Sequence, residues 1–369
     1  MPRFSIDPDI ARATTLDTAF YTDPELFLLA REKLFAPSWQ FVGDTALASV
    51  AGDAALASAP GDALPLTLLE GFLDEPLVLV RDRDSALRLL SNVCTHRGNI
   101  VVAQPCRLTQ LRCRYHGRIF DLDGRFRSMP EFREVANFPS AADNLTSLPL
   151  ETWGPWLFTS LSRRGRSFRD YCGDMMDRLH WLPLERFVLR PDLSRDFTVK
   201  AHWALYCENY LEGFHIPYLH AGLNAVIDFG NYTTELFRYS SLQLGIAKDD
   251  EECFDLPASS PDYGKMVAAY YFFVFPNLMF NFYPWGLSIN IVTPVGLSET
   301  RVSFLTYIVD ETRYNKGAGS GLDMVEFEDE EVVEAVQRGV RSRFYNHGRY
   351  SVTREQGTHH FDRLIAELL

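Results

Sequence analysis

Two short segments, each with one cysteine and one histidine, constrain this chain most strongly. They are Cys94-x-His96 and Cys113-x-x-His116, and sixteen residues separate them. Each segment presents one thiolate and one imidazole on a tight loop. Four such ligands in two short loops indicate a single metal centre.

Two kinds of metal centre fit these ligands. A structural zinc site uses two Cys and two His, but the usual finger groups Cys with Cys and His with His. In a Rieske [2Fe–2S] cluster, one iron takes two thiolates and the other takes two imidazoles. The alternation of Cys and His in both halves favours the Rieske cluster, with zinc as the alternative. Gly98 and Gly117 allow the tight turns that such loops require.

A second candidate metal site lies about a hundred residues downstream, in the segment ENYLEGFHIPYLH. It places His215 and His220 five residues apart. On a helix, both rings lie near one face, particularly if Pro217 distorts the turn. Two histidines with one carboxylate leave open positions for O₂ on Fe(II).

The sequence CTHRG…CRYHGRIFDLDG resembles the Rieske box of the aromatic-ring-hydroxylating oxygenase family, large subunit. The resemblance extends from about Thr15 to Leu364. Rieske proteins of respiratory bc complexes usually carry an extra disulfide cysteine in each loop. Here only Cys106 lies between the two halves, which favours the oxygenase branch. Cys106, Cys172, Cys207 and Cys253 are interpreted as buried thiols.

The resemblance implies an α+β fold with two domains. An all-β Rieske [2Fe–2S] domain is expected over residues 40–160. A helix-grip (START-like) catalytic domain with an antiparallel sheet is expected over 1–39 and 161–369, and it would hold one mononuclear Fe(II). Local patterns agree with this division, since helices are predicted over 24–38, 168–183 and 323–345, and strands over 76–82, 118–124, 155–161, 268–296 and 300–311.

The resemblance also implies roles for individual residues, with Asn209 and Glu212 as the candidate catalytic residues. Glu212 occupies the position of an acid three residues before the first histidine, which links a cluster histidine of one subunit to an iron histidine of its neighbour. Many relatives have Asp there, and Glu resembles the subgroup that oxidises choline, carnitine and betaines. The segment EFEDEEVVEAVQRG matches the family's C-terminal helix and makes Asp329 the expected third ligand, with Asp323 and Glu330 as alternatives. The acidic run is otherwise read as a solvated helix face.

The implied function is that of a terminal oxygenase that uses O₂ and reductase-supplied electrons, ultimately from NAD(P)H. The expected substrate is a small quaternary ammonium or N-methylated compound. Hydroxylation or O-demethylation of an aromatic acid is the alternative, and a zinc-stabilised ligand-binding protein without catalysis is an alternative of another class. The expected partners are a flavin or ferredoxin-type reductase and two further copies of the chain in a homotrimer.

Composition excludes several other classes of protein. The net charge of −13 argues against non-specific nucleic-acid binding. The absence of a long apolar run argues against a membrane span or a signal peptide, so the expected compartment is the cytoplasm. Nine aromatic residues between Tyr270 and Trp285 are expected to form core, with a few lining a pocket. Gly317–Gly321 is expected to be a flexible loop.

Overall fold

The computed structural model describes residues 4–45, 59–162 and 165–369, and it divides into two compact units. The small unit is Trp39–Gly165, and the large unit combines Met1–Ser38 with Arg166–Leu369. Part of the predicted range 40–160, namely 46–58, lies outside the described residues. None of the helices among the described residues is long and apolar enough to cross a membrane.

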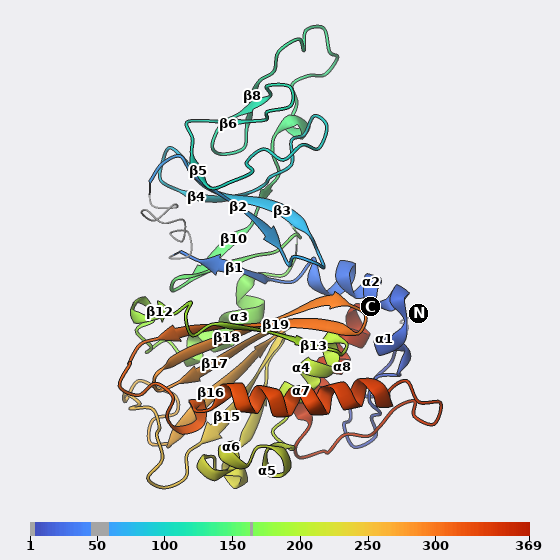
Figure 1. Ribbon diagram of the computed structural model, residues 1–369, viewed down its shortest axis with the longest axis vertical. Coiled ribbons are helices and arrows are strands. Elements are labelled where there is room, and N and C mark those ends of the chain that lie inside the picture. The colour runs from blue at the N-terminus through green and yellow to red at the C-terminus, as the bar shows by residue number, and fades with distance from the viewer. Residues whose placement is uncertain (1–3, 46–58, 163–164) are drawn as a thin grey trace. The chain divides into compact units, whose positions relative to one another are not determined.

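The described residues of the small unit form three antiparallel sheets, and several of their strands are labelled in Figure 1. The largest has the strand order β5 (Cys106–Arg107), β2 (Asp62–Leu68), β3 (Glu75–Arg81), β4 (Leu87–Ser91), β9 (Ser147–Leu148). The others are β1 (Gln40–Asp44), β11 (Trp156–Thr159), β10 (Leu150–Trp153) and β6 (Leu111–Arg112), β7 (Ile119–Phe120), β8 (Phe126–Ser128). The predicted strand over 118–124 shrinks to β7, because a turn closed by the Gly124 amide on the Asp121 carbonyl returns the chain to β8.

The large unit contains one eight-stranded antiparallel sheet. Its strands are β12 (Val188–Leu189), β13 (Arg195–Val199), β14 (Thr233–Leu236), β15 (Ser240–Ile246), β16 (Val267–Val274), β17 (Leu278–Tyr283), β18 (Gly286–Gly296) and β19 (Glu299–Ile308). The order is β12-β19-β18-β17-β16-β15-β14, with β13 also paired to β19. The apolar stretch 268–296 thus forms three strands, and every residue of β16 and β17 is buried.

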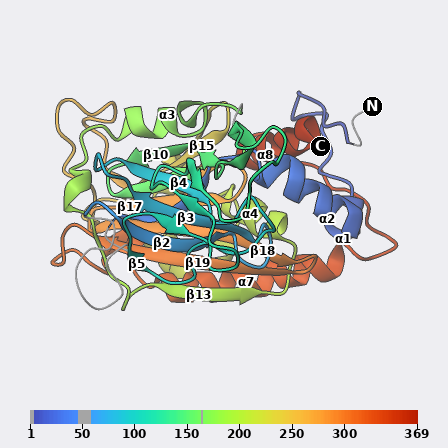
Figure 2. The same ribbon diagram turned by 90° about the horizontal axis from the view of Figure 1, so that it is seen from above.

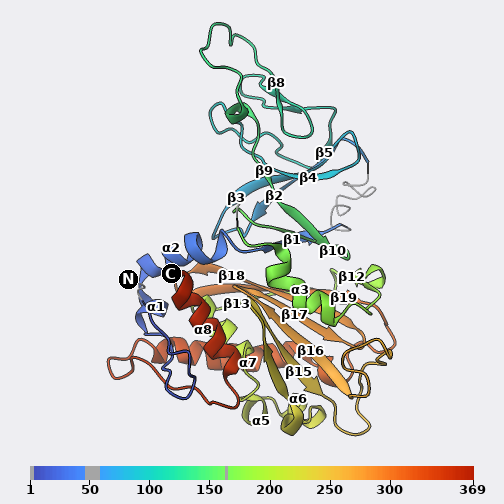
Figure 3. The ribbon, with the colours of Figure 1, turned by 180° about the vertical axis from the view of Figure 1, so that it is seen from behind.

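Helices cover both faces of this sheet. Figures 1 and 3 show α7 (Leu322–Gly339) and the segment of α5 (Ile216–Leu219) and α6 (Ala221–Val226) on one side, with α3 (Phe168–Arg178) on the other. α4 (Trp203–Tyr210) packs against α7 and β18. The helix predicted over 323–345 corresponds to α7, which ends earlier than predicted, at Gly339.

The N-terminal residues of the large unit lie beside its C-terminal helix. Figure 2 shows α1 (Ala19–Thr22) and α2 (Pro24–Ala30) next to α8 (Gln356–Leu368). The predicted helix over 24–38 is α2 continued by the π-helical turn η1 (Arg31–Phe35). A bridge between Thr14 and Arg349 joins the two ends of the chain. The expected α+β class, with an all-β unit and an antiparallel sheet carrying helices, is confirmed.

Candidate active site

The two cysteine–histidine loops of the small unit share one backbone pattern. In each loop the cysteine amide donates to the carbonyl five residues on, at 2.8 Å. The glycine four residues on donates back to the cysteine carbonyl, at 3.0 Å for Gly98 and 3.1 Å for Gly117. Both glycines have positive φ, 72° and 73°, which residues with a side chain rarely adopt. The two loops therefore present their cysteines in the same way.

The four side chains of these loops form two pairs. The thiols of Cys94 and Cys113 are neighbours in the apolar core of the small unit. The rings of His96 and His116 are only partly buried, and their Nδ1 atoms lie 3.2 Å apart. A pair of thiols beside a pair of imidazoles fits a cluster in which one iron takes sulfur ligands and the other nitrogen ligands. The imidazole pair is the solvent-facing end.

A buried ion pair ties both loops to the short helix η3 (Ala141–Asp143). Arg118, next to the second loop, is 2% exposed, and its guanidinium lies 2.7 Å from the Asp143 carboxylate. The hydroxyl of Thr95, in the first loop, donates to the Asp143 carbonyl at 2.8 Å. Asp143 thus connects the two loops, through its carbonyl to Thr95 and through its carboxylate to Arg118.

The histidines of the large unit do not share one helix, contrary to the sequence expectation. α4 ends at Tyr210, and His215 and His220 flank the single turn α5 that follows. Their rings meet because this turn brings its two ends together, with centroids 5.0 Å apart. Pro217 lies in the first turn of α5, where proline is well tolerated.

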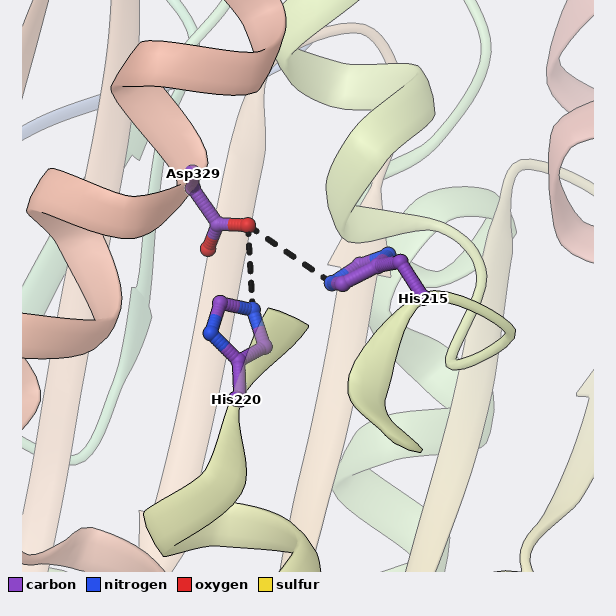
Figure 4. A group of neighbouring side chains, drawn as sticks. All are labelled: His215, His220 and Asp329. Atoms are coloured by element: carbon purple, nitrogen blue, oxygen red, sulfur yellow. Dashed lines mark hydrogen bonds and ion pairs between the residues drawn. The ribbon is translucent and has the colours of Figure 1, made fainter. Parts of the chain in front are cut away.

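Asp329, from α7, completes a three-residue group, as Figure 4 shows. Its Oδ1 lies 3.1 Å from His220 Nε2 and 3.6 Å from His215 Nε2. The ligand atoms of these three residues all lie within 4.8 Å of one another. Neither Asp323 nor Glu330, the alternative acids, belongs to this group among the described residues.

A second carboxylate faces the other nitrogen of each ring. His215 Nδ1 lies 2.6 Å from Glu212 Oε1, and His220 Nδ1 lies 2.7 Å from Glu328 Oε2. In a neutral imidazole whose Nδ1–H these glutamates accept, Nε2 presents a lone pair toward Asp329. This convergence of donor atoms suits a bound cation, and a proton on His220 meets the same need without one. Two histidines and one carboxylate are the donor set of non-haem Fe(II) oxygenases, so these residues fit that ion.

Electrostatics at His220 agree with this arrangement. Burial lowers the pKa of its ring, but hydrogen bonds and charge from Asp329 and Glu328 outweigh that effect and raise the pKa overall. The surroundings of the ring therefore favour a positive charge on it or beside it.

Two side-chain hydrogen bonds connect α4 to α7. Asn209 Nδ2 donates to Asp329 Oδ1 at 2.7 Å, and the Tyr206 hydroxyl donates to Glu326 Oε2 at 2.6 Å. The two donors are three residues apart on α4, and the two acceptors are three residues apart on α7. Each pair therefore lies on one face of its helix, and the two faces are turned toward each other. Asn209 thus acts on the carboxylate of Asp329 and fixes its orientation.

A cavity of about 110 Å³ opens beside the three-residue group, entirely within the large unit. Its acids are Glu212, Glu326 and Asp329, and no Lys or Arg occurs among the described residues that line it. Tyrosines make up much of the wall, and the polar wall residues come mostly from the sheet. These are Tyr206, Tyr210, Tyr232, Tyr271 and Tyr283 and, from the sheet, Gln243, Asn281, Ser288 and Asn290.

Several of these features do not follow from the sequence. The acidic run that contains Glu328 is equally consistent with a solvated helix face, and only the place of Glu328 beside Asp329 indicates that it can orient His220. The segment Gly317–Gly321 is not a loose loop. A Cβ at Gly319 would lie 2.2 Å from Trp285 Nε1, and Ala318 lines the cavity. Of the four cysteines expected to be buried, Cys106 and Cys253 are only partly so.

Comparison with known proteins assigns both units to families. Residues 63–139 match the Rieske [2Fe-2S] domain, and residues 179–369 match the ring hydroxylating alpha subunit (catalytic domain). Choline monooxygenase of Arabidopsis thaliana is 30% identical over 97% of this chain and 84% of its own length. The carnitine monooxygenase oxygenase subunit of Escherichia coli K12 is 28% identical over 96% of this chain and 94% of its own length.

Solved structures show the same fold. A quaternary ammonium Rieske monooxygenase in complex with L-carnitine superposes with a TM-score of 0.72, at 23% identity, covering 98% of this chain and 97% of that one. Naphthalene 1,2-dioxygenase from a Rhodococcus species gives 0.70 at 18% identity, covering 96% and 93%. The zinc alternative is therefore set aside. The chain belongs to the ring-hydroxylating family of Rieske iron oxygenases, which carry a [2Fe–2S] cluster and a mononuclear iron.

Proposed function

We propose that this oxygenase hydroxylates or N-demethylates a small quaternary ammonium or N-methylated compound. The observation that carries this proposal is the lining of the cavity, which combines acids and tyrosine rings with no Lys or Arg among the described residues. Aromatic faces and carboxylates attract a cationic head group. The carboxylate of an aromatic acid, the alternative substrate, would be repelled by the acids of the cavity and would find no Lys or Arg among the described lining residues. The similarity to choline and carnitine monooxygenases gives independent support.

The proposed ligands of the cluster are Cys94, His96, Cys113 and His116, in the small unit. Those of the iron are His215, His220 and Asp329, in the large unit. When bound, the cluster supplies one-electron transfer and the iron supplies open positions for O₂.

Neighbouring residues orient the side chains of the proposed iron ligands. Glu212 and Glu328 keep the Nδ1 protons of the two histidines, which frees each Nε2 for the metal. Asn209 fixes the Asp329 carboxylate. The tyrosine rings in the cavity wall would contact a bound head group and exclude water from it.

We further propose that the chain works as a homotrimer in which electrons pass between subunits. Glu212 would link the iron histidine His215 to a cluster histidine of the neighbouring subunit. Two features support this role. Glu212 contacts His215 directly, and the imidazole pair of the cluster loops is partly exposed to solvent. A related quaternary ammonium Rieske monooxygenase is described as using inter-subunit electron transfer.

The electron donor is proposed to be an acidic ferredoxin-like reductase. Seven arginines lie between residues 97 and 127, against two acids, Asp121 and Asp123. Four of the seven are engaged within the chain, since Arg107 pairs with Asp62, Arg118 with Asp143, Arg125 with Asp123, and Arg127 with Asp121. Arg97, Arg112 and Arg114 are exposed and make no ion pair among the described residues. They are the arginines available for docking.

A substrate panel tests the proposed activity. The holoenzyme is supplied with a surrogate reductase, and O₂ uptake and product are measured together for choline, carnitine and glycine betaine and for aromatic acids of similar size. Uptake coupled to product with at least one trimethylammonium compound is expected. Coupled oxidation of the aromatic acids alone would contradict the proposal.

A further inference from the structure

Glu326 is a buried acid in the cavity wall with one carboxylate oxygen that the protein does not use. Its side chain lies on α7 and is 4% exposed. Oε2 accepts the hydrogen bond from the Tyr206 hydroxyl, whereas Oε1 is inaccessible to water and has no hydrogen-bond partner among the described residues. A buried polar atom without a partner is costly and calls for an explanation. Since Glu326 lines the cavity, the charge of a bound cation would offset this cost without a direct contact to Oε1.

The position of Glu326 relates it to the metal site. It precedes Asp329 by three residues on the same helix, so their side chains lie on one face with Cβ atoms about 5–6 Å apart. The hydrogen bonds from Tyr206 and Asn209 hold the carboxylates of Glu326 and Asp329 toward α4. A group oxidised at the metal must therefore lie close to Glu326.

The other two acids of the cavity are already engaged. Glu212 accepts from His215 Nδ1 and from the backbone amides of Phe214 and His215. Asp329 accepts from Asn209 and faces both histidines. Glu326 is the acid whose charge no other group in the cavity uses, since no Lys or Arg is found among the described lining residues.

We propose that Glu326 is a specificity-determining residue whose carboxylate provides the counter-charge for the quaternary ammonium head group of the substrate. This inference rests on the proposed function. A quaternary nitrogen has no N–H to donate, so it interacts with the carboxylate through charge alone, while the tyrosine faces contact its methyl groups. The head group is thereby held beside the metal position, and a neutral group of equal size is not.

The charge state of Glu326 is consistent with this role. In the absence of a cation, burial raises the pKa of its carboxyl group to about 8. A positive charge nearby favours the ionised form, so occupation by a cationic substrate and ionisation of Glu326 support each other.

The experiment compares a cation with its neutral isostere. Binding of choline and carnitine to the resting, iron-loaded holoenzyme is measured anaerobically by titration calorimetry. The same is done with analogues in which a tert-butyl group replaces the trimethylammonium group. Glu326→Gln should weaken binding of the cations roughly 10- to 100-fold, because a buried charge partner is lost, and should change binding of the isosteres little.

Two further variants make the result specific. Glu331→Gln removes the same charge from the exposed side of α7 and should leave every affinity unchanged. Glu326→Asp keeps the charge and should restore most of the preference for the cation. Iron content measured on each protein reports whether the neighbouring Asp329 site is intact.

Two outcomes of these measurements distinguish the role of Glu326 from the proposed function. If wild-type protein oxidises a trimethylammonium compound and Glu326→Gln retains the same preference for cation over isostere, the role of Glu326 is wrong and the activity stands. If wild-type protein neither binds nor oxidises any of these cations, the proposed function itself is overturned, and the role of Glu326 with it.

Discussion

His220 Nδ1 lies 2.7 Å from Glu328 Oε2, so the residue directly before Asp329 positions one of the two histidines that face it. Glu328→Ala removes the acceptor that fixes this ring. We expect iron affinity to fall roughly 10- to 100-fold, as is usual when a carboxylate behind a ligating histidine is lost. Iron retained after dialysis against graded chelator concentrations measures the effect. The exposed Glu331→Ala is the matched control, and equal iron retention in both variants would rule out the positioning role.

Glu212→Gln tests the proposed relay. Glu212 accepts from the His215 ring with Oε1 and from a backbone amide with Oε2. Gln keeps one acceptor oxygen for the ring, so the iron site is retained, but it loses the charge and the second acceptor. Cluster, sulfide and iron contents should stay at wild-type levels, while oxidation of the reduced cluster in a single turnover slows about tenfold or more. Stopped-flow absorbance follows that step. Glu212→Asp should recover much of the rate, and an unchanged rate in Glu212→Gln would refute the relay.

Reversal of Arg97, Arg112 and Arg114 to Glu tests the docking surface. Steering by charge is screened over about 10 Å at 0.1 M salt, so reduction of the cluster by the reductase should slow strongly at low salt and differ little from wild type at high salt. Arg107 is a poor target, because it pairs with the buried Asp62 at 2.7 Å. An uncharged chemical reductant should reduce both proteins equally. A wild-type rate with the reductase at low salt would show that these arginines serve another purpose.

Asp362 predicts a pH dependence of stability. It lies on α8 beside Glu208, and burial raises its pKa to about 7, although a hydrogen bond from the Tyr350 hydroxyl opposes this. Since the folded pKa exceeds the unfolded value of 3.8, the favourable contribution is complete below about pH 4 and is lost as the pH rises through 7. The free energy of unfolding should therefore fall as the pH rises from 6 to 8.

Asp362→Asn has no proton to lose and should therefore flatten this dependence. The thermal midpoint of the holoenzyme, measured from pH 6 to 8, should fall less in this variant than in wild type. Glu367→Gln changes an exposed acid of the same helix and should keep the wild-type slope. Identical slopes for Asp362→Asn and wild type would show that this group does not titrate in that range.

The parts of the molecule that sequence predicts well depend on local spacing. Cys94 and Gly98, like Cys113 and Gly117, lie four residues apart, and that spacing sets the backbone pattern of both loops. The long apolar run after residue 267 predicts a buried sheet in the same way. Helix 24–38 follows from an amphipathic pattern bounded by Pro24 and Pro37.

The parts that sequence predicts poorly depend on contacts between distant segments. Glu326, Glu328 and Asp329 read alike in an acidic helix, and only the facing residues Tyr206, His220 and Asn209 give each a separate partner. The five-residue spacing of His215 and His220 predicts a continuous helix, but in the structure α4 ends at Tyr210 and the separate turn α5 lies between the two histidines. Packing under Trp285 orders the glycine-rich segment 317–321, and composition alone cannot indicate such packing.

Single turnover with Asp329→Ala and Glu330→Ala tests the central claim most directly, which is that His215, His220 and Asp329 hold the iron that oxidises a cationic substrate. Each protein is reduced, mixed with carnitine or choline and ¹⁸O₂, and analysed for labelled product, iron and cluster. Wild type and Glu330→Ala should form labelled product. Asp329→Ala should form none and should lose about one iron per chain while its cluster spectrum is kept. Labelled product from Asp329→Ala, together with its loss in Glu330→Ala, would contradict the account.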